Sequence, residues 1–181
     1  MGPKLAAPPA SAAAVAESDT KIGDWKSLAR AGRYEEALGA AHREGFDALL
    51  AQLNAADLAL LADAARLSGD NARARSALLT LRRRFAGSDA ASLAGFRLGR
   101  LAFAAGDYPD AARWFRAYLG ESRSGALADE ATGRLIEAQA RAGDRPRAEA
   151  SARDYLRRFP GGPYEALARG LWKGDRLAPR K

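Results

Sequence analysis

The sequence predicts an all-α fold, a solenoid of about four helical hairpins closed by a C-terminal capping helix. Glycines recur every 37 residues, and alanines recur at the same spacing five residues later: Gly32, Gly69, Gly106 and Gly143 with Ala37, Ala74, Ala111 and Ala148. A fixed period of this size is typical of proteins that stack one supersecondary unit many times. Glycine and proline fall at unit boundaries and not within alternating apolar runs, which favours helices over strands.

Each periodic glycine predicts the turn between the two helices of a hairpin, because glycine ends a helix in a left-handed conformation without steric cost. Asp70, Asp107 and Asp144 follow three of the glycines, where a carboxylate can accept the free amides of the next helix. Pro109 and Pro146 then stand in a first turn, where no hydrogen bond is lost. The periodic alanine lies on the inner face, where a small side chain lets two helices approach.

The chain begins with residues 1–17, which are rich in proline and alanine and almost free of large apolar side chains. Such a stretch cannot bury enough surface to order itself, so we expect a linker, serving as an incoming tether. Lys4 is the single basic residue of this stretch and no apolar run of signal-peptide length follows it, so a signal peptide is not expected.

The first unit, residues 18–54, is expected to break at Gly32 and to end its second helix at Gly45. Residues 46–53 then add an extra apolar turn. Asn54 follows as a good N-cap for the next helix.

The remaining units repeat this plan. Leucines dominate the first helix of unit 55–91, whose second helix ends in three arginines that suit a helix C-terminus. A short helix at the end would shield the exposed face of the stack. The expected segments are the units 55–91, 92–128 and 129–163, the capping helix 164–172 and a polar tail 173–181.

Unit 92–128 carries the most complete version of the repeat, with Leu98, Gly99, Ala111 and Phe115. It resembles the tetratricopeptide repeat (TPR), whose pattern is W-x2-L-G-x2-Y…A-x3-F…P. Gly95 and Ala102 replace the two aromatics, and in the next unit Ile136 replaces the small residue. The resemblance implies a right-handed α-α superhelix that acts as a protein–protein interaction module and holds a peptide or partner protein in its concave groove.

The loops between units are about three residues longer than in the usual TPR of 34 residues. In residues 84–88 and 158–164 they resemble a subgroup of bacterial envelope repeats. That subgroup includes the Tol-associated cell-division coordinator, the Bam-complex lipoprotein and the C-terminal parts of anti-sigma regulators. The resemblance implies a periplasmic or envelope-associated protein in a bacterial envelope or regulatory assembly, with a cytoplasmic location as the alternative.

Catalytic and metal chemistry find little support in the sequence. The chain has no cysteine and one histidine, His42, which lies near a predicted helix end, so a transition-metal site or a Ser/His/Asp triad finds few suitable residues. Acidic neighbours such as Glu35 and Glu36 point in different directions on a helix and do not form an acid/base pair. We therefore expect no enzyme, no cofactor and no metal. No run approaches the roughly 18 apolar residues of a membrane span.

The net charge of +7 leaves a second class open, a basic helical repeat that binds nucleic acid or an anionic surface. Against it, the arginines spread over many helices with acidic residues between them, and they do not repeat from unit to unit as base-reading side chains do. Nucleic acid is therefore the less favoured partner.

The TPR resemblance places the partner site on the first helices, along the stripe opposite the hairpin seam. Lysine and arginine make this stripe partly basic, and two phenylalanines offer apolar anchors; the alternative is that both phenylalanines pack against the preceding unit. The predicted partner-binding residues are Lys26, Asp63, Arg66, Phe96, Arg100, Phe103 and Glu137.

Overall fold

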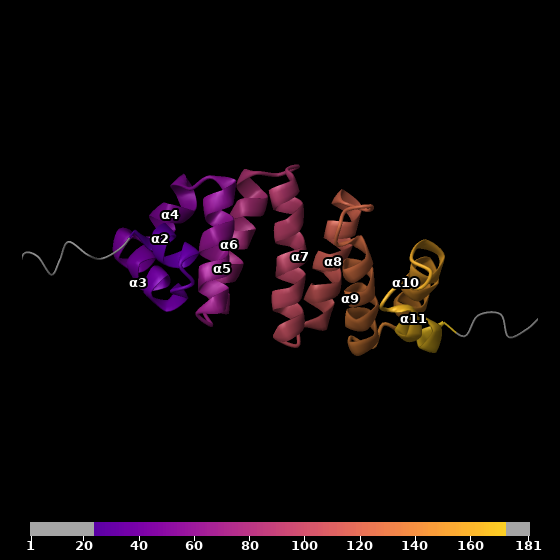
Figure 1. Ribbon diagram of the computed structural model, residues 1–181. Coiled ribbons are helices and arrows are strands. Elements are labelled where there is room, and N and C mark those ends of the chain that lie inside the picture. The colour runs from indigo at the N-terminus through magenta and orange to yellow at the C-terminus, as the bar shows by residue number, and fades with distance from the viewer. Residues whose placement is uncertain (1–23, 173–181) are drawn as a thin grey trace, which may run out of the picture.

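The computed structural model describes residues 24–172, so the predicted linker 1–17 and tail 173–181 lie outside the described residues. Residues 24–172 form ten helices and no strand, and the helices follow one another along one axis (Figure 1). They are α2 (Trp25–Arg30), α3 (Tyr34–Glu44), α4 (Phe46–Gln52), α5 (Ala55–Leu67), α6 (Asn71–Arg84), α7 (Asp89–Ala104), α8 (Tyr108–Glu121), α9 (Ala128–Arg141), α10 (Arg145–Arg158) and α11 (Glu165–Leu171). The prediction of an all-α solenoid is confirmed.

The helices pair into four hairpins, α2 with α3, α5 with α6, α7 with α8 and α9 with α10. Each hairpin packs on the next through its second helix, as α6 does on α7 and α8 on α9. The extra apolar turn after Gly45 is the short helix α4, which contacts α3 and α6. Helix α11 covers the end of the stack and contacts α9 and α10.

The periodic glycines form the hairpin turns, as predicted. All four have positive φ, between +77° and +87°. In each turn the residue after the glycine donates its N–H to a carbonyl of the first helix at 2.8–2.9 Å: Arg33 to Leu28, Asp70 to Ala65, Asp107 to Ala102 and Asp144 to Gln139. This is the hydrogen bond of a left-handed helix C-cap. The three aspartates accept amides of the next helix, and Asn54 does the same for α5.

In three hairpins, the seam between the two helices is filled at equivalent positions by side chains of complementary size. In α7 and α8, a Cβ added to Gly99 would lie 2.8 Å from the ring of Phe115. The equivalent positions 37 residues later hold a large residue on the first helix and a small one on the second, Ile136 and Ala152, both fully buried. The departure of Ile136 from the TPR pattern is therefore offset by Ala152. The unit before holds an intermediate pair, Ala62 and Leu78.

The last residue of each of three second helices also joins neighbouring units. Arg84 donates to the carbonyls of Leu50 and Leu53, both at 2.8 Å. Arg158, at the equivalent position, donates to the carbonyl of Arg123. Between them, Glu121 accepts from Arg82 at 2.6 Å. These bonds hold neighbouring units together at the long loops. The two arginines pair carbonyl groups that have no partner within regular structure, and the Arg82–Glu121 bond pairs two charged side chains.

Tyrosine side chains fasten the C-terminal cap. The ring of Tyr164 lies directly on Gly133 of α9, where an added Cβ would come within 2.2 Å of the ring. Tyr155 donates its hydroxyl to Asp129 at 2.6 Å and accepts the N–H of Tyr164 at 3.1 Å. Ala168 of α11 is fully buried against this cluster.

The alanine periodicity makes a stability prediction on helix α10. Ala148 is fully buried, whereas Ala150 on the same helix is exposed. Ala148→Leu should overpack the hairpin seam and lower the free energy of unfolding by about 1–3 kcal/mol, measured by urea denaturation. Ala150→Leu is the control and should change it by less than about 0.5 kcal/mol. Equal losses at both positions would contradict this helix phase.

A second prediction concerns alkaline pH. Burial, with the hydrogen bond to Asp129, raises the pKa of Tyr155 to about 12 from its ordinary 10.0. The folded chain therefore keeps a proton that the unfolded chain releases, and this contribution to stability is lost as the pH rises from about 10 to 12. Urea denaturation across this range should show a shallower decline in Tyr155→Phe. An unchanged slope in that variant would contradict the assignment.

Candidate partner-binding groove

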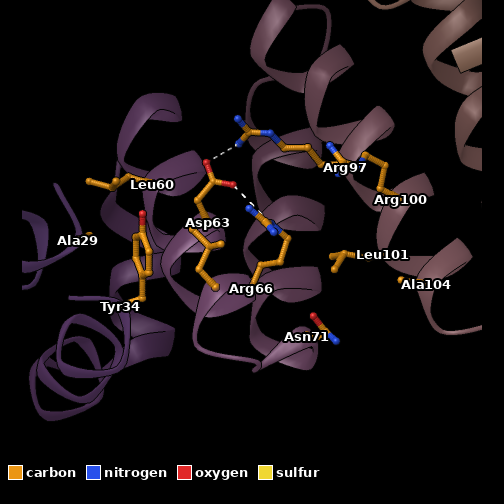
Figure 2. A pocket seen from close by; sticks show the side chains of 11 residues that line it. Ala29, Tyr34, Leu60, Asp63, Arg66, Asn71, Arg97, Arg100, Leu101 and Ala104 are labelled. Atoms are coloured by element: carbon orange, nitrogen blue, oxygen red, sulfur yellow. Dashed lines mark ion pairs between the residues drawn. The ribbon is translucent and has the colours of Figure 1, made fainter. Parts of the chain in front are cut away.

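A concave feature lies on the first helices of three successive hairpins. It has a volume of about 630 Å³ and is open to solvent. Helices α2, α5 and α7 supply most of its walls, and these first helices contact one another directly. Figure 2 shows this groove; its lining residues are Ala29, Tyr34, Leu60, Asp63, Arg66, Leu67, Asn71, Arg97, Arg100, Leu101 and Ala104.

Leucines give the groove an apolar floor. Leu60 and Leu101 are half-buried, from α5 and α7. Leu67, at the end of α5, is 45% exposed and is the one exposed large hydrophobic side chain among residues 24–172. Tyr34, the first residue of α3, closes the groove near the first hairpin. Together, the exposed leucine and its half-buried apolar neighbours give the groove a contiguous apolar surface.

Asp63 joins two of the groove arginines. In Figure 2 its carboxylate lies between the guanidinium groups of Arg97 and Arg66. The distances are 3.1 Å to Nη1 of Arg97 and 3.9 Å to Nε of Arg66. The pair with Arg97 crosses from α5 to α7, so it ties the two walls together as well as neutralising one charge. All three side chains are partly solvated, which limits the contribution of these pairs to stability.

Arg100 is the groove cation without an ion pair among residues 24–172. Its side chain is exposed on α7, and it lines both the main groove and a smaller pocket of about 190 Å³. Phe103, Ala104, Phe115 and Arg134 complete this second pocket, which lies toward α9. Because Arg100 and Ala104 belong to both hollows, the two form one continuous surface across α5, α7 and α9.

Phe103 holds the arginines of α9 in place. The guanidinium carbons of Arg134 and Arg141 lie 5.7 and 5.1 Å from the centre of its ring. Tyr108 packs edge-on against the same ring at 5.3 Å and accepts a hydrogen bond from Arg141. Stacking of this kind favours arginine over lysine and leaves the outer N–H groups free to bind carboxylates. Glu137 already occupies one edge of Arg134, at 2.9 Å.

The structure brings together part of the predicted site. Asp63, Arg66 and Arg100 line one groove, and Phe103 lines the adjoining pocket. Lys26 instead pairs with Asp57 at 2.7 Å and is not among the lining residues. Glu137 accepts a hydrogen bond from Arg134, which lines the smaller pocket, but is not itself among the lining residues. Whether these residues bind a partner stays a prediction.

The prediction that Phe96 is an exposed anchor is wrong, because its side chain is only 2% exposed. Its ring packs against Phe115 and Tyr118 of α8, with centroids 5.7 and 5.5 Å apart. The alternative is also wrong for this residue, since these contacts are within its own hairpin. Phe96 precedes Gly99 by three residues and so shares the face that meets Phe115.

Sequence reasoning missed the apolar floor and Arg97. Leu60 and Leu67 lie three residues before and four residues after Asp63, and Leu101 follows Arg100 directly. A wider stripe at spacings of three and four would have included both α5 leucines. The 45% exposure of Leu67 depends on how the hairpins pack, which the spacing of apolar residues does not encode.

Residues 24–172 contain no group of three or more His, Cys, Asp or Glu side chains able to hold a metal ion. His42 packs edge-on against Phe46, 5.9 Å between ring centres. Within those residues, none of the helices combines the length and apolar character needed to span a bilayer.

Comparison with known proteins identifies the fold. No protein-family model matches the sequence, and no curated protein matches it either. Among solved structures, the chain is similar to a kinesin light chain-like protein of Podosopora anserina, whose TPR-like repeats are nearly identical to one another. The TM-score is 0.59 at 12% identity, over 81% of this chain and 79% of that chain. A single-substitution variant of those repeats matches equally well. The chain therefore has a TPR-like repeat fold.

Proposed function

We propose that this chain is a non-catalytic protein–protein interaction module that binds a peptide or a segment of a partner protein in the groove across α2, α5 and α7. The observation that carries the proposal is Leu67, an exposed leucine on the floor of a groove bordered by arginines. Burying the apolar surface of a leucine is favourable, and arginine is enriched among the residues that dominate binding free energy at protein interfaces. The TPR-like fold supports a protein partner.

The scaffold suits this role because the groove rests on a rigid base. The seam residues behind α5 and α7, such as Leu61 and Leu98, are fully buried. The exposed groove side chains, such as Leu67 and Arg100, therefore stand on a packed base that does not depend on them. A preformed surface of this kind avoids much of the ordering cost of binding.

Site-specific cross-linking tests the proposal. The photoreactive residue p-benzoyl-phenylalanine would replace Leu67 in the groove and, as the control, Arg153, an exposed residue on α10. In cells of the source organism, the groove position should capture a defined protein that the control position does not. Identical cross-linked products from both positions, or products only from Arg153, would contradict the proposal.

The compartment forms part of the same proposal. We place the module in a bacterial envelope or regulatory assembly, periplasmic or envelope-associated, with a cytoplasmic location as the alternative. The support is the resemblance of the loops 84–88 and 158–164 to envelope-type repeats. Fractionation of cells expressing the complete gene should recover the protein with the envelope or the periplasm. Recovery only in the cytoplasm would reject this placement.

A further inference from the structure

We propose that the groove selects a partner segment by the order of its side chains: a neutral or basic end over α3, an apolar anchor over α5, and carboxylates over α7 and α9. This inference rests on the proposed function and adds the class of partner and its polarity. The inference rests on three neighbouring hollows: the main groove, a hollow at the first hairpin and the smaller pocket toward α9. They share lining residues, and the charge of their lining changes from acidic to basic along the solenoid.

The acidic end lies at the first hairpin. A hollow of about 330 Å³ is lined by Arg33, Glu35, Glu36 and by Tyr34 and Leu67, the two residues it shares with the main groove. Arg33 already pairs with Glu36, so the exposed carboxylate of Glu35 is the charge left over. A partner carboxylate would be repelled here, whereas a neutral or basic residue would not.

The basic end lies at α7 and α9. Three arginines and one aspartate line the main groove, and Asp63 is already engaged by Arg97 at 3.1 Å. The smaller pocket is lined by two arginines and no acidic residue. Arg100 belongs to both hollows and has no ion pair within residues 24–172, so it is the cation most available to a partner carboxylate. Planar guanidinium groups bind carboxylates through two parallel hydrogen bonds.

Between these ends lies the apolar floor. Leu67 stands where the acidic hollow meets the main groove, because it lines both. A partner's aliphatic or aromatic side chain packed on Leu67 would place the residues on one side of it near Glu35 and those on the other side near Arg100. The same order also disfavours a reversed segment, whose carboxylates would face Glu35 while a basic residue faced Arg100. Repulsive contacts against the wrong partner are one of the two ways in which interfaces achieve specificity.

Selection from a random dodecapeptide library displayed on phage tests the inference on the intact chain. Binders selected on the wild-type chain would be sorted by whether they still bind Arg100→Glu and Leu67→Ser variants. Arg153→Glu is the matched control, because it makes the same charge reversal on an exposed residue far from the groove. Circular dichroism melting of each variant checks that the fold is retained.

We expect peptides that depend on the groove to carry an apolar residue followed on one side by Asp or Glu. For a synthetic peptide from this set, Arg100→Glu should weaken binding about tenfold or more, and replacing the acidic residues by Asn or Gln should weaken it similarly. Arg153→Glu should leave the affinity unchanged. The peptide with its acidic and basic ends exchanged should also bind about tenfold more weakly.

The contrary results separate the two proposals. Peptides that depend on the groove but show no acidic enrichment, or that bind equally well with exchanged ends, would overturn this inference and leave the proposed function standing. Selected peptides that bind both groove variants as they bind the wild type would contradict the proposed function itself. A dodecauridylate RNA that binds more tightly than any peptide, with the same dependence on Arg100, would overturn both in favour of nucleic acid.

Discussion

Moving the Ile136–Ala152 pair into the preceding hairpin should restore stability that each single substitution removes. Gly99→Ile alone forces a side chain into the ring of Phe115, since even a Cβ would lie 2.8 Å from it. We expect a loss of about 3 kcal/mol in the free energy of unfolding. Phe115→Ala alone empties a fully buried site and should cost about 3–5 kcal/mol.

In the double variant, the isoleucine can occupy the space that the phenylalanine leaves. The combined loss should then fall short of the sum of the single losses by about 1–3 kcal/mol, measured by urea denaturation as a double-mutant cycle. Gly120→Ala is the control, because an added Cβ meets no neighbour there and should be neutral or slightly stabilising. Strict additivity of the two seam substitutions would show that the seam does not work by complementary size.

Trp25→Ala should unfold the first hairpin and with it one wall of the groove. The indole is only 1% exposed and is among the largest fully buried side chains of the described residues. Its truncation should cost about 3–5 kcal/mol. Because each hairpin of a solenoid contacts only its neighbours, the damage should stay at this end, and thermal unfolding followed by circular dichroism should separate into two steps.

Binding of a groove peptide to Trp25→Ala should weaken as well, because Ala29 and Tyr34 belong to the same hairpin and line the groove. Trp114→Ala is the comparison. That indole is half-buried on α8, donates to Asp110 and does not line the groove, so its loss should be smaller and should spare binding. A single cooperative transition with full affinity in Trp25→Ala would contradict this view of the first hairpin.

The hairpins were predictable from sequence because their turns depend on local chemistry. The left-handed conformation of Gly32 and the caps at Asp70 and Asn54 involve residues within a few positions of one another. The groove was only partly predictable. Its walls depend on contacts between residues more than 30 positions apart, such as Asp63 with Arg97, and no short-range pattern encodes those distances.

Phe96 and Gly133 illustrate the limit of a strict repeat. They occupy equivalent positions 37 residues apart, and Phe96 was predicted to lie on the concave stripe. In the structure, Phe96 fills the inside of its own hairpin, whereas the space beside Gly133 is filled by Tyr164 from the cap. Each unit fills this part of its structure with a different side chain. The exposure of a residue in one unit therefore does not predict the exposure of the equivalent residue in the next.

The central claim is that the concave groove, and not the outer surface, receives the partner. A titration of the ¹⁵N-labelled chain with a groove-dependent dodecapeptide, followed by two-dimensional NMR, tests it most directly. We predict that the largest amide shift changes fall within residues 60–71 and 97–104, with smaller ones at Tyr34. Largest changes on α6, α8 and α10, with those two segments unaffected, would contradict the account.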